Sequence, residues 1–313
     1  MNTGVLVSGP TVRDVLTAIH AAEAAGIGSV WMTSGPTVPD PLAIFTAAAA
    51  TTQRIGFGTA IVHTFPRHPV SMAATALAVE SLAPGRLRLG VGPSAPMVIE
   101  PTFVISAERP QEHLRDYLTI LRALLADGRV DFRGKRLSAK AQLAAPTGIR
   151  VMASALRANA YELCGEVADG AISWVSPLAY LRDVAKPALA RGAAKASRPV
   201  PALVGHVPVV VCEEPAVARD AFRKGLGFFA RIPNYQNMLA DAGFPEVRET
   251  GAWSDGAIDA LVIHGDAASV EARLRSLSEF GIDEAMVSIF VPEGAPAGAY
   301  ASTLALLGRV NAS

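Results

Sequence analysis

Four polar side chains capable of acid–base or hydrogen-bonding chemistry follow one apolar stretch. Residues 55–62 are apolar and β-compatible, and His63, Thr64, Arg67 and His68 then arrive within six residues. In a parallel α/β protein, ligands bind at the carboxyl ends of the strands. An imidazole can take up or release a proton near neutral pH. His63 is therefore the candidate catalytic residue, with a structural or substrate-contacting histidine as the alternative.

The other histidines are weaker candidates. His68 precedes a proline, which favours an extended, surface-leaning conformation. His206 lies inside an apolar run and is predicted to be a core residue with satisfied polar atoms. His264 follows another apolar run and is predicted to be structural. His113 lies within a predicted helix and is expected in solvent.

Few other side chains indicate chemistry. Glu100 and Glu108 flank an insertion after the fourth predicted strand and are candidate acids. The chain has no Cys/His cluster with zinc spacing, no HExxH and no calcium-loop pattern, so it predicts no metal site.

The composition narrows the class of partner. The 313 residues carry 28 Lys and Arg against 28 Asp and Glu, a formal net charge of zero. Neutrality and the lack of basic runs argue against nucleic acid and anionic membranes as main partners. No stretch reads as a signal peptide or a membrane span, and two cysteines are too few for a disulfide framework. We therefore expect a cytoplasmic protein that acts on a small-molecule substrate.

The elements that must position these residues alternate regularly. Eight apolar runs predict strands at residues 4–7, 29–33, 54–62, 86–92, 150–153, 170–175, 202–212 and 284–291. Segments with helical periodicity separate them. Continuous apolar runs are typical of buried parallel strands. The pattern predicts one (β/α)₈ TIM barrel domain over residues 1–313. A two-domain doubly wound sheet is disfavoured, because no Gly-x-Gly-x-x-Gly opens a helix near the N-terminus.

Three segments are longer than an ordinary βα loop. They are the insertions after strands 4 and 7, at residues 93–107 and 232–256, and a segment near residues 127–148. Long loops in compact barrels are often lids or binding loops, so we expect these segments to set the substrate.

Four motifs carry a family resemblance. They are AEAAGIGSVWMT at 22–33, GFGTAIV at 56–62 before RHP at 67–69, LAPGRLRLGVG at 82–92 and LCGEVADGAI at 163–172. In this order and spacing, the chain resembles the luciferase-like monooxygenase superfamily, specifically its branch that depends on the deazaflavin coenzyme F420. The resemblance spans nearly the whole chain. It implies a barrel with a flavin or deazaflavin across its carboxyl-terminal face, and a homodimer.

The resemblance also assigns cofactor-binding residues. It implies a non-prolyl cis peptide bond between Ala60 and Ile61, pressed against the cofactor ring. The residues implied to line or border the ring are Thr33, Ser34, Thr59, Ala60, Ile61, Gly92, Pro93 and Ser94.

The segment after the fifth predicted strand is a candidate site for the cofactor phosphate. It consists of Ser154, Ala155, Leu156 and Arg157. Small residues let backbone N–H groups at a helix N-terminus approach an anion, and a guanidinium suits phosphate. An ordinary helix start with a solvated arginine is the alternative.

Two departures from the resemblance affect the chemistry. Sugar-phosphate dehydrogenases of the family carry Asp-His after the second strand, where this chain has Ser34-Gly35. They carry an acidic residue after the fourth strand, where this chain has Pro93 and Ser94. The first expectation is still an F420-dependent oxidoreductase that moves hydride to or from an unidentified organic substrate. The alternatives are an FMN-dependent two-component monooxygenase and a non-catalytic F420- or flavin-binding protein.

Overall fold

Each of the eight predicted strand segments contains a parallel strand of one closed sheet. The structure is a computed structural model and describes residues 2–312. The strands are β1 (Asn2–Leu6), β2 (Ser29–Met32), β3 (Gly56–Thr59), β5 (Leu87–Gly92), β8 (Arg150–Ser154), β9 (Gly170–Ile172), β10 (Ala202–Val211) and β12 (Glu284–Ile289). In this order each strand pairs with the next, and β12 pairs with β1. The predicted (β/α)₈ barrel is confirmed.

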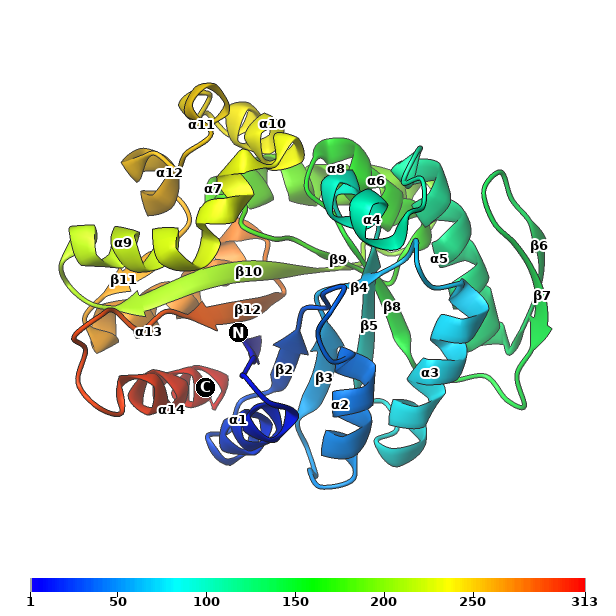
Figure 1. Ribbon diagram of the computed structural model, residues 1–313, viewed down its shortest axis with the longest axis horizontal. Helices are drawn as coiled ribbons and strands as arrows, with labels where there is room; N and C mark the ends of the chain where they lie inside the picture. Colours follow the sequence, from blue (N-terminus) through cyan, green and yellow to red (C-terminus); the bar gives the residue numbers. More distant parts are fainter. Residues whose placement is uncertain (1, 313) are drawn as a thin grey trace.

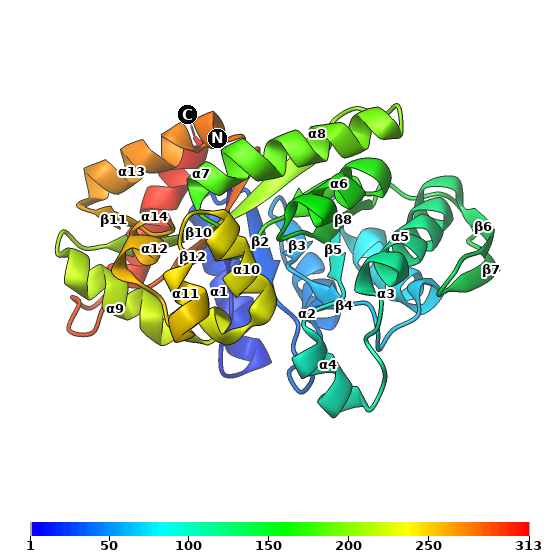
Figure 2. The same cartoon turned by 90° about the horizontal axis from the view of Figure 1, so that it is seen from above.

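Helices cover the outside of the barrel (Figure 1 and Figure 2). The main ones are α1 (Val12–Ala24), α2 (Pro41–Ala49), α3 (Pro69–Leu82), α5 (Pro110–Asp127), α6 (Ala158–Val167), α8 (Lys186–Lys195), α9 (Pro215–Leu226), α13 (Ala267–Arg275) and α14 (Ala299–Asn311). Shorter pieces are α7 (Leu178–Tyr180), η1 (Leu181–Ala185) and η3 (Ser276–Phe280). Among residues 2–312, no helix combines the length and apolarity needed to cross a bilayer.

Local sequence signals explain how two of these helices form. Thr11 and Asp14 make a reciprocal capping box at the start of α1, in which each side chain accepts the other's backbone N–H. In α5 the apolar residues at helical spacing are buried, namely Leu114, Tyr117, Leu118, Leu121 and Leu125. Burial of that face holds α5 against the barrel.

The core has two apolar layers. A large cluster fills the space between strands and helices, and a small one fills the barrel interior. The buried members of the inner cluster are Trp31, Ala60, Met152, Ile172, Val204 and Met286. The barrel is therefore packed rather than hollow below its carboxyl-terminal rim.

A polar cluster forms the floor of the barrel, at the amino ends of the strands. The Glu284 carboxylate is 5% exposed and accepts hydrogen bonds from Ser29 Oγ (2.6 Å) and Trp31 Nε1 (3.1 Å). Arg88 forms an ion pair with it and lies over the Trp31 ring. Burial lowers the pKa of Arg88 to about 10. This value is still well above neutral pH, so the guanidinium stays charged. Asn2 Nδ2 of β1 also donates to this carboxylate at 3.4 Å, so the floor holds one buried carboxylate with partners from three strands.

The predicted strand at residues 54–62 is divided in two. β3 ends at Thr59, and β4 (Val62–His63) continues beside β5. The bond between them, Ala60–Ile61, is a non-prolyl cis peptide, as the resemblance implied.

The three long segments contain structure of their own, at two different ends of the barrel. The first holds α4 (Pro96–Phe103), and the last holds α10 (Pro233–Asp241) and α11 (Glu246–Thr250), preceded by η2 (Gly227–Arg231). Residues 127–148 form a hairpin of β6 (Arg129–Arg133) and β7 (Ser138–Gln142). The hairpin connects α5 to the amino end of β8, so it lies at the opposite end from the ligand-binding rim. The expectation of a lid or binding loop was therefore wrong for this segment.

His113 is buried rather than solvated. Its ring stacks on Phe65 with a centroid distance of 4.0 Å and is 5.9 Å from the Tyr117 ring one turn later in α5. Phe65 comes from the loop after β4, so the burial depends on a contact that helical periodicity does not reveal.

Helices α6 and α8 approach each other unusually closely because of two glycines. A Cβ at Gly192 of α8 would overlap the Glu162 backbone, and one at Gly165 of α6 would overlap the Leu189 carbonyl. We expect Gly192→Ala to lower the free energy of unfolding by about 1–3 kcal/mol, because the backbones must separate. Urea denaturation followed by circular dichroism measures the change.

Gly227 supplies the matched control. Its φ of −56° is helical, and a Cβ there would meet no atom within 4 Å. Gly227→Ala should leave the denaturation midpoint unchanged or raise it slightly, since alanine restricts the unfolded chain. Equal midpoints for the two variants would contradict the close-packing argument.

Candidate active site

A cavity of about 800 Å³ opens at the carboxyl ends of the barrel strands. Residues that end or follow several strands line it, including Thr33 after β2, Pro93 after β5, Ser154 at the end of β8, Trp174 after β9 and Ser288 in β12. The location agrees with the general position of ligands in parallel barrels.

Six of the predicted ring-binding residues meet along one side of this cavity. They are Thr33, Ser34, Ala60, Ile61, Pro93 and Ser94. The Ser34 hydroxyl and backbone N–H both donate to the Ile61 carbonyl oxygen, at 2.8 and 3.3 Å. These bonds fix the end of β2 against the turn between β3 and β4. We call these six residues the ring side of the cavity.

Thr59 and Gly92 support the cavity from behind and do not line it. The buried Thr59 hydroxyl donates to the Gly90 carbonyl at 2.7 Å. A Cβ at Gly92 would overlap Ser154 Oγ, so glycine leaves room there for the Ser154 hydroxyl. Their contact with a cofactor stays a prediction from the resemblance.

The candidate phosphate segment lies only partly in the cavity wall. Ser154, Ala155 and Leu156 line the cavity, whereas Arg157 does not. Arg157 precedes α6 without capping it, and its Nε lies 2.9 Å from an Asp241 carboxylate oxygen at the end of α10. The guanidinium is thus engaged with the late insertion rather than solvated alone.

His63 lines the cavity and is 9% exposed. Burial lowers its pKa below the ordinary histidine value of 6.5, so the imidazole is neutral at pH 7. Within residues 2–312, the cavity lining includes no Asp, Glu, Lys or Arg. The other titratable lining residues are Tyr235 and Tyr300, whose pKa values burial raises. His63 is therefore the one lining group that exchanges a proton near neutral pH.

The candidate acids of the fourth-strand insertion lie outside the cavity. Glu100 accepts the backbone N–H of Ala107 at 3.0 Å and closes the turn after α4. Neither Glu100 nor Glu108 is among the lining residues. Among residues 2–312, no group of three or more His, Cys, Asp and Glu side chains could hold a metal ion.

The side of the cavity opposite the ring side is rich in aromatic rings. We call it the aromatic wall, and it consists of Trp174, Phe228, Phe229, Tyr235 and Phe290. The Phe229 centroid lies 6.0 Å from Trp174 and 5.0 Å from Tyr235. Phe228, Phe229 and Phe290 were not predicted from the sequence as site residues. The adjacent phenylalanines were a usable signal, because consecutive residues of a helix point about 100° apart and therefore toward different surroundings.

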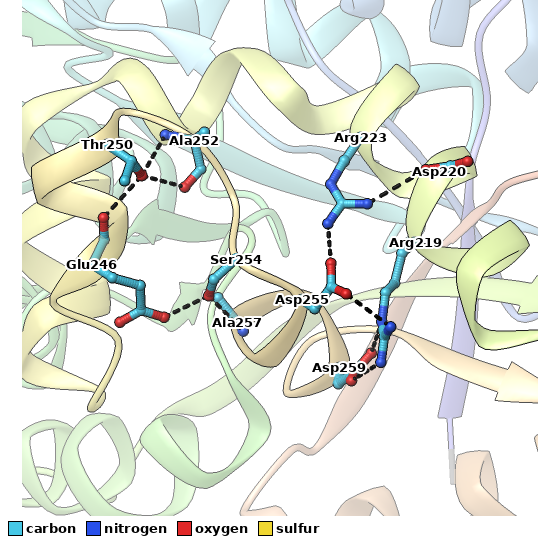
Figure 3. Close-up of polar contacts among 10 residues, drawn as sticks. All are labelled: Arg219, Asp220, Arg223, Glu246, Thr250, Ala252, Ser254, Asp255, Ala257 and Asp259. Atoms are coloured by element: carbon cyan, nitrogen blue, oxygen red, sulfur yellow. Dashed lines mark hydrogen bonds and ion pairs between the residues drawn. The ribbon is translucent and has the colours of Figure 1, made fainter.

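Ion pairs outside the cavity hold the segment that carries the aromatic wall. Arg219 of α9 binds Asp259 and Asp255 of α12 (Asp255–Asp259), and Arg223 also pairs with Asp255 (Figure 3). The Ser254 hydroxyl donates to Glu246 of α11 at 2.5 Å (Figure 3). These ion pairs join α9, which precedes the insertion at residues 232–256, to α12 at its end.

Comparisons with known proteins give the same fold and add relatives. The sequence model of the family described as luciferase-like monooxygenase matches residues 2–284. An F420-dependent glucose-6-phosphate dehydrogenase of Beutenbergia cavernae is 32% identical over 224 residues, which cover 66% of each chain.

Two solved structures are similar over nearly the whole chain. An F420-dependent tetrahydromethanopterin reductase from Methanopyrus kandleri superposes with a TM-score of 0.77 at 19% identity, covering 98% of this chain and 97% of that one. The oxygenating component of 3,6-diketocamphane monooxygenase from Pseudomonas putida, in complex with FMN, has a TM-score of 0.71 at 17% identity, covering 100% and 98%. Both likenesses show the fold. The family match over residues 2–284 shows that the chain belongs to the luciferase-like monooxygenase family.

Proposed function

We propose that the protein is an F420-dependent oxidoreductase, which transfers hydride between the deazaflavin and an organic substrate. The observation that carries this proposal is the cavity at the carboxyl ends of the strands, whose ring side unites six residues assigned to the cofactor. The sequence identity of 32% to an F420-dependent glucose-6-phosphate dehydrogenase, over 66% of this chain, supports it.

The residues present fit a flat ring with room beside it. The ring side offers small or flat groups such as Ser34, Ala60 and Ser94. A volume of about 800 Å³ lies in the upper part of the range of roughly 300–1,000 Å³ for small-molecule pockets. The cavity therefore has space for a cofactor ring on one side and a substrate against the aromatic wall.

The chain's own contribution would be orientation and a proton. Bound F420 would supply the carbon that accepts or releases hydride. The ring side would hold it, with Ser34 keeping the Ile61 carbonyl in place. His63, neutral at pH 7, would take the proton from a substrate hydroxyl as hydride leaves the adjacent carbon.

Binding of F420 and FMN to the purified protein tests the cofactor. We expect F420 to bind with micromolar affinity and FMN to bind more weakly, as measured by fluorescence titration. Micromolar binding of FMN with no binding of F420 would instead favour the FMN-dependent monooxygenase. That second function is kept because a structure with the same fold holds FMN.

The phosphate segment makes a separate prediction. The first N–H groups of α6 lack intrahelical acceptors, and Arg157 lies next to them. Arg157→Ala should weaken F420 binding by about tenfold, because a hydrogen bond to a charged group is lost. Asp241→Asn should not weaken it, since the competing carboxylate is removed. Arg182→Ala is the matched control, because Arg182 is an exposed arginine paired with Asp183. If Arg157→Ala bound F420 with unchanged affinity, Arg157 would be only the ion-pair partner of Asp241 and not a phosphate ligand.

A homodimer remains part of the proposal, on the resemblance alone. Sedimentation of the purified protein at two concentrations measures its mass in solution.

A further inference from the structure

A buried histidine below the aromatic wall has a defined tautomer. The Val175 backbone N–H donates to His206 Nδ1 at 3.3 Å, and the ring stacks on Trp174 at 3.9 Å. Burial lowers the pKa of His206 to about 3, so the ring is neutral. Because Nδ1 accepts a hydrogen bond, the single ring proton must be on Nε2.

This tautomer determines what Ser288 can do. His206 Nε2 lies 2.7 Å from Ser288 Oγ and must be the donor of that hydrogen bond. The Ser288 hydroxyl therefore accepts from His206 and keeps its own proton for another acceptor. No acceptor for that proton occurs within residues 2–312, and Ser288 lines the cavity. Ser288 is thus a donor directed by His206 toward whatever occupies the cavity.

Ser288 stands across the barrel from the part of the ring side that follows β5, and two strands from the part that follows β2. In the closed order of eight strands, β12 lies four positions from β5, which is directly across the barrel. Pro93 and Ser94 of the ring side follow β5. Ser288 instead neighbours Ile289 and Phe290. A second donor, Trp174 Nε1, is buried there without a partner in residues 2–312.

The lack of charged side chains in the described cavity lining limits which ligands can bind on this side. The described lining has no cationic side chain, and Arg157 is engaged with Asp241 outside it. A buried phosphate or carboxylate without a cation is strongly disfavoured. The sugar phosphate named for the Beutenbergia cavernae relative therefore does not match this cavity. Neutral donors next to aromatic rings match an uncharged molecule with one accepting oxygen.

We propose that the substrate is an uncharged, largely apolar molecule whose carbonyl or hydroxyl oxygen accepts a hydrogen bond from Ser288. Its apolar part packs against the aromatic wall. This inference rests on the proposed function for the position of the cofactor, which leaves the aromatic side for the substrate.

Three probes test the inference by binding to the purified protein. Cyclohexanone has the accepting oxygen, methylenecyclohexane has the same shape without it, and glucose 6-phosphate is charged. Saturation-transfer NMR and isothermal titration give the affinities for the protein and for two variants. In Ser288→Ala, cyclohexanone should bind about fivefold more weakly, from loss of one net hydrogen bond, while methylenecyclohexane changes by less than about twofold. Ser288→Thr keeps a hydroxyl and should retain most of the cyclohexanone affinity.

Several results would overturn the inference. Equal weakening of both cyclic probes in Ser288→Ala would assign Ser288 a structural role. Binding of glucose 6-phosphate as tight as that of cyclohexanone, or no binding of cyclohexanone to the unaltered protein, would reject the substrate class. An F420 titration of the same samples separates the two proposals. Failure of F420 binding with retained probe selectivity contradicts the proposed function alone.

Discussion

Arg88→Ala is expected to lower the free energy of unfolding by about 3–5 kcal/mol, because it leaves a buried carboxylate without its cation. Glu284 is 5% exposed. Its remaining partners are neutral donors from Asn2, Ser29 and Trp31. The substitution also removes the guanidinium from the face of the Trp31 ring. The floor of the barrel would then contain an uncompensated charge and a small cavity.

Urea denaturation, followed by circular dichroism and by tryptophan fluorescence, measures this loss. The exposed ion pair between Lys224 and Glu293 is the matched control, and Lys224→Ala should hardly change the midpoint. The double variant Arg88→Met with Glu284→Leu removes both charges and should be more stable than Arg88→Ala alone. An Arg88→Ala midpoint equal to that of Lys224→Ala would show that the floor ion pair contributes little.

His63→Gln is expected to slow turnover by about 10²–10⁴-fold, the usual contribution of a general acid or base. His63 is the one cavity-lining group among residues 2–312 that exchanges a proton near neutral pH, so no neighbouring carboxylate can replace it. Cyclohexanol oxidation, followed by loss of F420 absorbance, gives kcat and KM. We expect kcat to decrease, whereas KM and the affinity for F420 should stay nearly unchanged.

The pH profile adds a readout that a structural role would not give. Burial lowers the pKa of His63, so the neutral base persists throughout the neutral range. Oxidation should therefore decline only as pH falls below the ordinary histidine value of 6.5 and the imidazole is protonated. His63→Gln should lack that decline.

His20, which hydrogen-bonds Thr51 on the surface, provides the control His20→Ala. Turnover of His63→Gln at the unaltered rate would exclude His63 as the base, and F420 binding without turnover of any alcohol or ketone would favour a non-catalytic binding protein.

The barrel was predictable because its strands are continuous apolar runs of the right length and number. The hairpin of β6 and β7 was not predicted. Val130 and Phe132 do alternate with charged residues in β6, as in a half-buried strand, but the less exposed positions of β7 are alanines, which favour strands only weakly. Its turn lies on α5, where Asp116 accepts the backbone N–H groups of Arg136 and Leu137. That contact joins residues about twenty positions apart and leaves no local pattern.

The candidate site was predictable on one side only. Motifs located the ring side, because those residues follow strands whose order the sequence reveals. Three rings of the aromatic wall, Phe228, Phe229 and Tyr235, depend on how the segment after β10 folds back. That segment packs through buried side chains such as Phe222 and Trp253, whose rings meet edge to face at 5.2 Å. Arg157 could be singled out as a cation near a helix start, but its partner Asp241 lies 84 residues away. The tautomer of His206 required knowledge of which backbone N–H faces Nδ1.

The uncharged cavity wall has a consequence for the kinetics of ligand capture. Attraction between charges accelerates encounter and weakens as salt screens it. An uncharged substrate approaching a wall without charged side chains has no such attraction, so its association rate should be independent of ionic strength. An anionic cofactor drawn to Arg157 would associate more slowly as salt rises. The two ligands would thus reach the same cavity by encounters that respond differently to the ionic environment.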